Sequence, residues 1–163
     1  MINLNIDLKD GKYSIEMKYG NISVFNSNGS MIHYKDSNGY EVWKEYDSNG
    51  NVIHYKNSNG YEHWYEYDAN GNEIHYKNSN GYDQWSEYDS NGNCVHYKSS
   101  NGYEQWKEYD FHKNLIHYKN TNGYEQWYHN GETISKKEYD RIHNSCHGKV
   151  VEYDGKKYQL TEL

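Results

Sequence analysis

Five histidines recur at a constant spacing of 21 residues, and they are the first side chains in this sequence that could do chemistry. Imidazole is a common zinc ligand, so the column invites a metal interpretation. If each 21-residue segment contributes two strands to an antiparallel sheet, equivalent residues lie about 9.5 Å apart. A metal–nitrogen bond is only about 2 Å long, so one ion cannot reach two of these rings. The sequence therefore predicts a stacked, structural ladder formed by His33, His54, His75, His96 and His117.

A second candidate metal site lies near the C-terminus, at His143, Cys146 and His147. Their spacing of i, i+3 and i+4 would place all three on one face of a helix. Zinc usually takes a fourth ligand or a water and an orienting outer shell of hydrogen bonds. This segment also has the pattern of a fraying helix end, so we predict no metal.

Paired carboxylates such as Glu62 and Glu66 could suggest glycoside hydrolysis. Four residues along a strand correspond to about 13 Å, which exceeds the roughly 5 to 9.5 Å that the two hydrolytic mechanisms use. The sequence also has no glycine-rich phosphate loop, nucleophile elbow or Cys-His dyad. We therefore expect a protein that is not an enzyme and needs no cofactor.

These side chains belong to a repeat that occupies residues 33–131 and whose second copy reads HYKNSNGYEHWYEYDANGNEI. Repetition at a short fixed period indicates an array in which each unit buries its apolar side against its neighbours. Most positions are constant, so the variable ones show what the scaffold leaves free. Three positions vary: Val42, His63, Gln84, Gln105 and Gln126; Lys44, Tyr65, Ser86, Lys107 and Tyr128; and Val52, Glu73, Cys94 and Leu115.

The composition is polar but rich in rings. The mean hydropathy is −1.33, yet 17% of the residues are aromatic, including 21 Tyr and 5 Trp. Aromatic rings can supply the buried area that Leu and Val usually supply. No stretch approaches the roughly 20 apolar residues of a membrane helix. Residues 1–12 have neither the basic start nor the apolar run of an export signal, so none is expected. With only Cys94 and Cys146, a reducing, cytoplasmic location is expected.

The predicted fold class is all-β: an elongated antiparallel meander built from 21-residue two-strand repeats. Runs rich in Ile, Tyr and Trp alternate with Asn-Ser-Asn-Gly and Asp-Ser/Ala-Asn-Gly turns. Residues 1–24 form an N-terminal β cap and residues 25–131 form the repeats. Residues 132–163 form a cap that contains a helix from the capping box at Ser135 to about His143 and a hairpin over 150–160.

Two strand registers satisfy the 21-residue period, because the two turns must then differ by one residue. The favoured one uses a two-residue Asn59-Gly60 turn and a three-residue turn over 69–71, and pairs Tyr55 with Trp64 and Ile53 with Glu66. It places Trp64, Ile53, Tyr55, Glu62 and Glu66 on one face, and the variable positions with the His and Lys ladders on the other. The alternative has a three-residue loop over 57–61 and a four-residue second turn. It places Trp64 beside His54 and His75, and Glu62 beside Lys56 and Lys77.

About 100 residues resemble the YD repeat of Rhs and teneurin-type proteins. The motif occurs at Tyr46-Asp47, Tyr67-Asp68 and Tyr88-Asp89, each followed by Ser/Ala-Asn-Gly and by a second Gly about ten residues later. In that family, long arrays wind into a β-shell that encloses a toxin. The resemblance implies the same style of fold, whereas the Tyr-Glu-x-Trp-x-Glu half of each unit is closer to MORN repeats.

The excess negative charge is confined to the first three repeats. Residues 33–53, 54–74 and 75–95 carry net charges of −2, −3 and −2, which account for the −7 of the chain. With no basic stripe, direct nucleic-acid binding is disfavoured. The acidic surface suits a basic, nucleic-acid-handling protein partner, as for an inhibitor or decoy of the phage anti-defence or anti-CRISPR type. It would comprise Glu41, Glu45, Asp47, Glu62, Glu66, Asp68, Glu73, Asp83, Glu87 and Asp89, with Tyr65 beside them.

Three other interpretations remain open. The charge could serve only solubility, since an open sheet needs charge to resist edge pairing. Asn, Asp, Trp and Tyr in repetition also suit a carbohydrate or cell-wall binding module, in which rings such as Tyr65 or Tyr128 would stack on sugars. The third interpretation is a truncated YD array that acts as a scaffold in a larger assembly.

Overall fold

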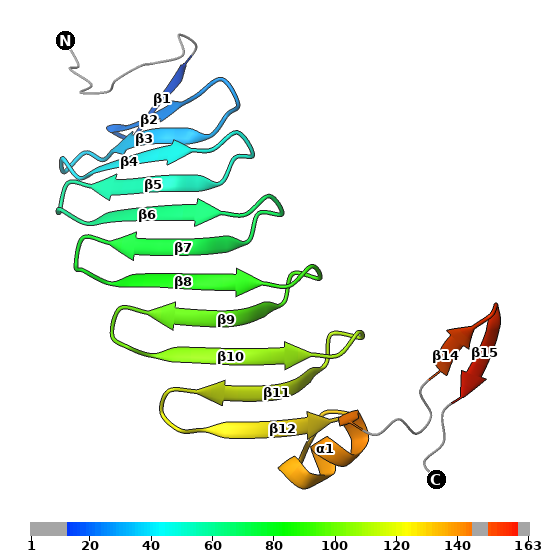
Figure 1. Ribbon diagram of the computed structural model, residues 1–163. Helices are drawn as coiled ribbons and strands as arrows, with labels where there is room; N and C mark the ends of the chain where they lie inside the picture. The colour runs from blue at the N-terminus through cyan, green and yellow to red at the C-terminus, as the bar shows by residue number, and fades with distance from the viewer. Residues whose placement is uncertain (1–12, 145–149, 160–163) are drawn as a thin grey trace. The chain divides into compact units, whose positions relative to one another are not determined.

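The computed structural model describes residues 13–144 and 150–159, and the chain divides into two compact units. The first unit is Met1–Gly102 and the second is Tyr103–Leu163. Both are built from antiparallel strands joined in sequence order, as the predicted meander requires (Figure 1).

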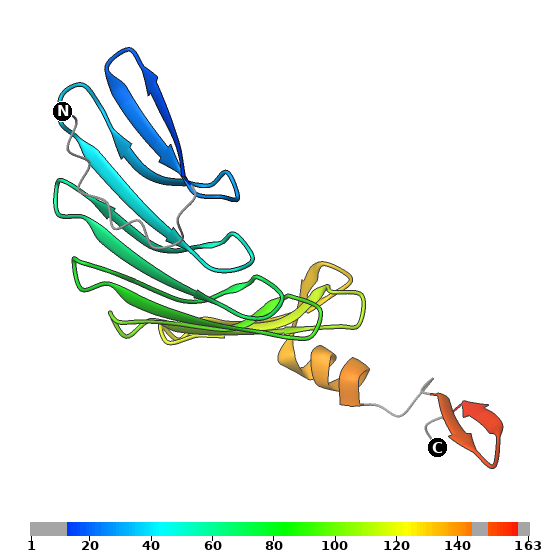
Figure 2. The ribbon, with the colours of Figure 1, turned by 90° about the horizontal axis from the view of Figure 1, so that it is seen from above.

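The described part of the first unit is a single twisted layer of strands without a helix (Figures 1 and 2). Each strand pairs with the one before it through a short turn, so the contacts are local in sequence. The strands are β1 (Ser14–Lys18), β2 (Asn21–Phe25), β3 (Met31–Lys35), β4 (Glu41–Tyr46), β5 (Val52–Asn57), β6 (Glu62–Tyr67), β7 (Glu73–Asn78), β8 (Asp83–Tyr88) and β9 (Cys94–Ser99).

Both turns of a repeat have the same three-residue geometry. Gly60 N donates to Asn57 O at 3.1 Å, and Gly71 N donates to Asp68 O at 3.1 Å. The leading Asn or Asp also accepts backbone N–H groups with its side chain: Asp68 Oδ1 binds the nitrogens of Asn70 and Asn72, each at 2.9 Å. Such side-chain acceptors fix the turn locally, which explains the constant Asn and Asp at these positions.

The favoured register is therefore wrong in its first turn, and the alternative is wrong in its second. His54 pairs with Trp64, and Lys56 pairs with Glu62, as the alternative predicts. Glu66, not Trp64, pairs with His75, and Trp64 pairs with Lys77. The odd residue of the period is not in a loop at all.

The odd residue of the 21-residue period lies in a β-bulge that immediately precedes each ladder histidine. The pairing runs from Glu66 with His75 to Tyr67 with Glu73, so Ile74 has no opposite residue. A bulge inserts one residue into one strand and flips the side-chain alternation beyond it. Equivalent bulges recur at Ile32, Ile53, Val95 and Ile116.

The bulge sorts the side chains onto two chemically distinct faces. We call the first the ladder face; in the repeat around β6 it carries His54, Lys56, Glu62, Trp64 and Glu66. We call the other the tyrosine face; there it carries Tyr55, His63, Tyr65, Tyr67 and Tyr76. The prediction that the three variable positions share a face is confirmed, but the His and Lys ladders lie on the opposite face, and Tyr55 is separated from Trp64.

Hydrogen bonds between successive repeats take the place of a deep core. Among the described residues the buried apolar side chains are Val24 and Val42. The hydroxyl of Tyr67 donates to Val52 O at 3.0 Å, and Tyr46 and Tyr88 make the same contact one repeat away. Stability in such an array comes from cross-strand pairs rather than from one central cluster.

The second unit ends in the predicted cap. Strands β10 (Glu104–Tyr109), β11 (Leu115–Asn120), β12 (Glu125–His129) and β13 (Glu132–Ile134) precede helix α1 (Lys136–Asn144). Ser135 caps the helix by accepting Glu138 N at 3.2 Å. Strands β14 (Val150–Tyr153) and β15 (Lys156–Gln159) form the predicted hairpin. Predictions for residues 1–12, Cys146 and His147 lie outside the described residues.

Candidate functional site

The ladder face of the first unit is built from rows of side chains that cross the strands. One row runs from β4 to β8 through consecutive cross-strand pairs: Glu45, His54, Trp64, Lys77 and Asp83. The His54 and Trp64 rings stack with centroids 5.4 Å apart and an interplanar angle of 14°. Lys77 Nζ lies 5.2 Å from the Trp64 ring centroid. Trp64 is thus held between an imidazole and an ammonium group, a favourable stacking and cation–π arrangement.

The next row repeats the same order of chemistry. Glu66 pairs with His75, His75 with Trp85, and Trp85 with Lys98. The His75 and Trp85 rings stack at 5.2 Å and 10°. Because Glu66 is two residues beyond Trp64 on β6, each row is displaced along the strands relative to the previous one.

His54 and His75, the ladder histidines of the middle repeats, each lie between two carboxylates. His54 Nε2 is 2.8 Å from Glu62, and its Nδ1 is 3.4 Å from Glu45. His75 Nε2 is 2.6 Å from Asp83, and its Nδ1 is 3.1 Å from Glu66. The carboxylate at Nε2, which we call the inner one, is less exposed than the outer one at Nδ1. The inner carboxylates also face lysines: in the first repeat, Lys35 Nζ donates to Glu41 at 2.7 Å.

This geometry predicts a pH dependence of stability at His75. Burial alone lowers the pKa of His75, but hydrogen bonds and charges from Glu66 and Asp83 outweigh burial and raise it. The folded-state pKa therefore exceeds the unfolded value of about 6.5. The stabilisation is complete below that value and is lost as the pH rises through the folded-state pKa. We expect the urea midpoint of the wild type to fall between about pH 6 and pH 8, and less so in His75→Asn.

The control for this prediction is His112→Asn, which changes an exposed turn histidine. Its midpoint should follow the wild-type pH dependence. An unchanged pH dependence in His75→Asn would show that Glu66 and Asp83 do not stabilise the imidazolium.

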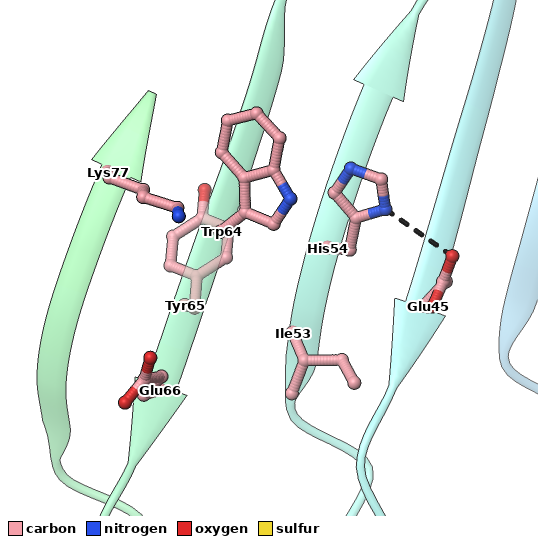
Figure 3. A pocket seen from close by; sticks show the side chains of 7 residues that line it. All are labelled: Glu45, Ile53, His54, Trp64, Tyr65, Glu66 and Lys77. Atoms are coloured by element: carbon pink, nitrogen blue, oxygen red, sulfur yellow. Dashed lines mark hydrogen bonds and ion pairs between the residues drawn. The ribbon is translucent and has the colours of Figure 1, made fainter. Parts of the chain in front are cut away.

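A shallow cavity of about 350 Å³ opens on the ladder face between these rows (Figure 3). Ile53 and His54 form one side and Trp64 lies opposite, with carboxylates and an ammonium group at the rim. Ile53 reaches this face because it is the bulged residue, which brings it to the same side as its neighbour His54. The lining residues are Glu45, Ile53, His54, Trp64, Tyr65, Glu66 and Lys77.

The predicted acidic surface separates into groups with different contacts. Asp47, Asp68 and Asp89 serve the turns through Asn51, Asn72 and Asn93, whose side-chain amides donate to them at 2.9 to 3.0 Å. Side-chain hydrogen bonds from Asn51 and Asn72 hold the pKa values of Asp47 and Asp68 below their usual range.

The remaining predicted residues lie on both faces. Glu41, Glu62 and Asp83 are the inner, part-buried carboxylates of the ladder. Glu45, Glu66 and Glu87 are the outer ones, with side chains 66%, 68% and 72% exposed. Glu73 and Tyr65 lie on the tyrosine face, where Glu73 accepts a hydrogen bond from Gln84 at 3.1 Å and the Tyr65 ring lies 5.2 Å from the tilted ring of Tyr76. The structure thus brings together only the ladder carboxylates.

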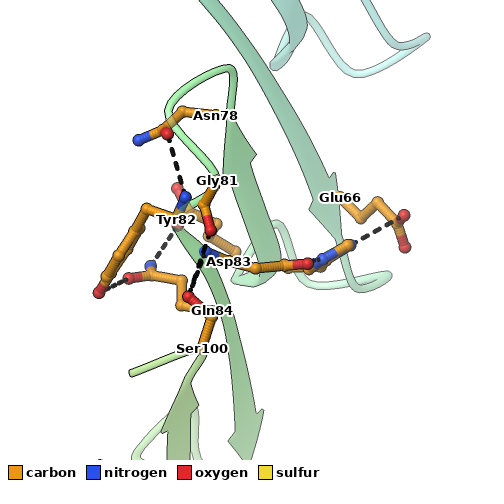
Figure 4. A network of polar contacts seen from close by, with 9 residues as sticks. Glu66, Asn78, Gly81, Tyr82, Asp83, Gln84 and Ser100 are labelled. Carbon is orange, nitrogen blue, oxygen red and sulfur yellow. Dashed lines mark hydrogen bonds and ion pairs between the residues drawn. The ribbon is translucent and has the colours of Figure 1, made fainter. Parts of the chain in front are cut away.

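The tyrosine face combines two variable positions around each constant tyrosine. Tyr55 lies between Lys44 and His63, and Tyr76 lies between Tyr65 and Gln84. Gln84 accepts a hydrogen bond from Tyr82 at 3.1 Å (Figure 4). The hydrogen bond with Tyr97 raises the pKa of Tyr82 to about 12. Two variable positions that are 19 residues apart in sequence, such as Lys44 and His63, therefore lie on either side of one tyrosine.

Two structural features were missed by sequence reasoning. The Ser79 hydroxyl accepts a hydrogen bond from the backbone nitrogen of Glu62 at 3.1 Å. The Ser100 hydroxyl accepts one from Asp83 N at the same distance (Figure 4), so each turn is joined to the preceding repeat. The signal was present as a constant Ser or Thr at Ser58, Ser79, Ser100 and Thr121. The sequence signal for the bulge was weaker: an apolar residue always precedes the ladder histidine.

The described residues form neither a metal-binding cluster nor a membrane-spanning helix. Within residues 13–144 and 150–159, no group of three or more His, Cys, Asp or Glu side chains is placed to hold a metal ion. In the same part of the chain, no helix has the length and apolar character needed to span a membrane.

The fold is similar to parts of much larger solved structures. No family model matches the chain, and no curated protein matches its sequence. The crystal structure of TcdB2-TccC3-TEV matches with a TM-score of 0.55 and 19% identity, over 67% of this chain and 6% of that one. TcdB2-TccC3-Cdc42 matches with a TM-score of 0.56 and 18% identity, over 70% of this chain and 7% of that one. The chain thus spans under a tenth of these structures, and at this identity the likeness concerns the β-meander fold, in agreement with the style of fold implied by the YD resemblance.

Proposed function

We propose that the chain is a non-enzymatic repeat scaffold that binds a basic protein partner through the ladder face of its first unit. The observation that carries this proposal is the column of outer carboxylates at Glu45, Glu66 and Glu87, whose side chains are about two-thirds or more exposed. They recur on one face of a unit that also carries the excess negative charge of the chain.

Electrostatics supports a basic partner over a neutral one. Regularly spaced like charges raise the local concentration of an oppositely charged protein and speed its association. The same charges repel nucleic acid directly. A partner that itself handles nucleic acid would present a complementary basic groove, and the chain would then act as an acidic inhibitor or decoy of anti-defence or anti-CRISPR type.

The ladder tryptophans are poorly suited to sugar stacking. One face of Trp64 contacts His54 and Lys77 lies over the ring, so a pyranose would have to displace a charged side chain. This geometry favours the protein-binding proposal over a carbohydrate module on this face.

Charge reversal tests the proposal. The variant Glu45→Lys/Glu66→Lys/Glu87→Lys should weaken binding to a basic partner at least 30-fold, because three exposed attractions become repulsions. The partner is first retained from a bacterial lysate at low salt and released at about 0.5 M salt, where the Debye length is only a few ångströms. Its dissociation constant is then measured with duplex DNA as competitor.

The matched control is Glu16→Lys/Glu132→Lys/Glu152→Lys, which makes the same change in net charge at exposed positions of other strands. Circular dichroism checks that both variants fold. If both variants weakened binding equally, the effect would be due to net charge and not to the ladder face. Unchanged affinity in the ladder variant would refute the proposal. Salt-insensitive retention of a polysaccharide would favour the carbohydrate module instead.

A further inference from the structure

The second unit shows a site equivalent to the cavity of the first unit, and there the site is occupied. Three repeats separate the two, so Ile53, His54 and Trp64 correspond to Ile116, His117 and Trp127. The His117 and Trp127 rings stack at 5.3 Å and 13°, as His54 and Trp64 do.

Helix α1 covers this equivalent site with two side chains one turn apart. Tyr139 lies against His117, with ring centroids 6.3 Å apart. Lys136 Nζ lies 5.9 Å from the Trp127 ring centroid, a contact that Lys77 of strand β7 already makes with Trp64 in the first unit. Figure 2 shows α1 beside the last strands of the sheet.

The electrostatic surroundings of Tyr139 match those expected at the cavity. Burial, followed by the charge of Glu108, raises the pKa of Tyr139. Glu108 contacts His117 Nδ1 at 3.1 Å and corresponds to Glu45, which contacts His54 Nδ1 at 3.4 Å. The ladder face can therefore hold a neutral tyrosine side chain close to a carboxylate.

The cavity of the first unit differs from the occupied site in charge. Its rim carries two carboxylates, Glu45 and Glu66, beside Lys77, whereas the position equivalent to Glu66 is His129 in the second unit. An occupant of the first unit is therefore favoured by an additional positive charge. Trp85 in the following row is 41% exposed, which leaves an aromatic edge for that occupant to contact.

We propose that the cavity bounded by Ile53, His54 and Trp64 binds an aromatic side chain carried on a basic α-helix of the partner. The helix presents a Lys or Arg three residues before the aromatic residue, the spacing that Lys136 and Tyr139 have on α1. Residues three apart share a helix face, so the aromatic ring enters the cavity while the cation meets Glu45 or Glu66. This inference rests on the proposed function and names the element that the partner uses.

The experiment titrates the full chain, labelled with ¹⁵N at its tryptophan indoles, with synthetic peptides. The first probe is a helical Ala- and Lys-rich peptide of about 20 residues with one Lys-x-x-Tyr motif. We expect it to shift the Trp64 and Trp85 indole resonances and to leave Trp127 in place, because α1 already covers Trp127. Its affinity should drop about tenfold when its Tyr is replaced by Ala, and by a similar factor for Glu66→Gln in the protein.

The controls separate the inference from the proposed function. The matched protein variant is Glu73→Gln, which removes a carboxylate on the tyrosine face and should leave the affinity unchanged. Equal binding of the Tyr-to-Ala peptide, or of a proline-interrupted peptide of the same composition, would overturn the inference while leaving a basic partner for the ladder face. If no basic ligand bound the protein, neither the peptides nor the partner from the lysate, both the inference and the proposed function would be overturned. Shifts of the Trp127 resonance with concentration-dependent dimerisation would show instead that α1 of a second copy is the occupant.

Discussion

Replacing Trp64 by Ala is expected to lower the free energy of unfolding by about 3 kcal/mol, at the lower end of the range for truncation of large core aromatics. Trp64 is part-buried, but it makes the contacts that join three strands. It stacks on His54 across β5 and lies under Lys77 of β7. Because an array of repeats has no distant core to compensate, the loss falls on the neighbouring strands.

The measurement is urea unfolding of the full chain, followed through the remaining tryptophans, with hydrogen exchange of the β6 amides as a local probe. Tyr19→Ala is the control, since that ring is 88% exposed and its removal should change stability by less than about 0.5 kcal/mol. A loss below about 1 kcal/mol in Trp64→Ala would mean that the strands are held mainly by their backbone ladders.

Gly71→Val is expected to destabilise the first unit by about 2 kcal/mol, because Gly71 has φ +86°. L-residues pay roughly 1 to 2 kcal/mol in this left-handed region, and a β-branched residue is at the upper end. A Cβ at this position would meet no atom within 4 Å. The whole effect is therefore one of backbone conformation, not of steric overlap with neighbours.

Gly71→Asn is the matched comparison, since Asn tolerates positive φ, and it should retain most of the stability. Thermal unfolding of the two variants at one pH distinguishes them. Equal losses in both would contradict the backbone explanation and indicate that the turn tolerates no side chain.

The repeats, the turns and the C-terminal cap were predictable from the sequence because each has a local cause. Asn57 and Asp68 fix their turns through neighbouring backbone nitrogens, and Ser135 caps α1. These interactions lie within a few residues of one another, so residue type and spacing are sufficient to predict them.

The register was not predictable because the odd residue of the period lies in a strand. Val52 and Ile53 read as an ordinary apolar pair, yet only Val52 pairs, with Tyr46. A one-residue offset moves a whole set of side chains to the opposite face. The favoured register consequently grouped Tyr55 with Trp64, whereas the bulge places the Trp, His, Lys and Glu side chains together.

The sequence predicted which repeats carry the acidic residues, but not where their side chains lie on the sheet. Counting charge cannot distinguish Asp68, which the turn uses, from Glu66, which is exposed on the ladder face. That distinction depends on cross-strand neighbours, which the register determines.

The bulge also has a consequence for how such a protein can evolve. It places the three variable positions of the repeat on the tyrosine face, while the stacked His and Trp rings lie on the ladder face. Duplicated repeats can therefore diverge at positions such as His63 or Tyr65 without disturbing the stacked rows behind them. The stacked rings and the variable positions thus lie on opposite sides of the same strand, so that a repeat can change its tyrosine face while the rings on its ladder face stay the same.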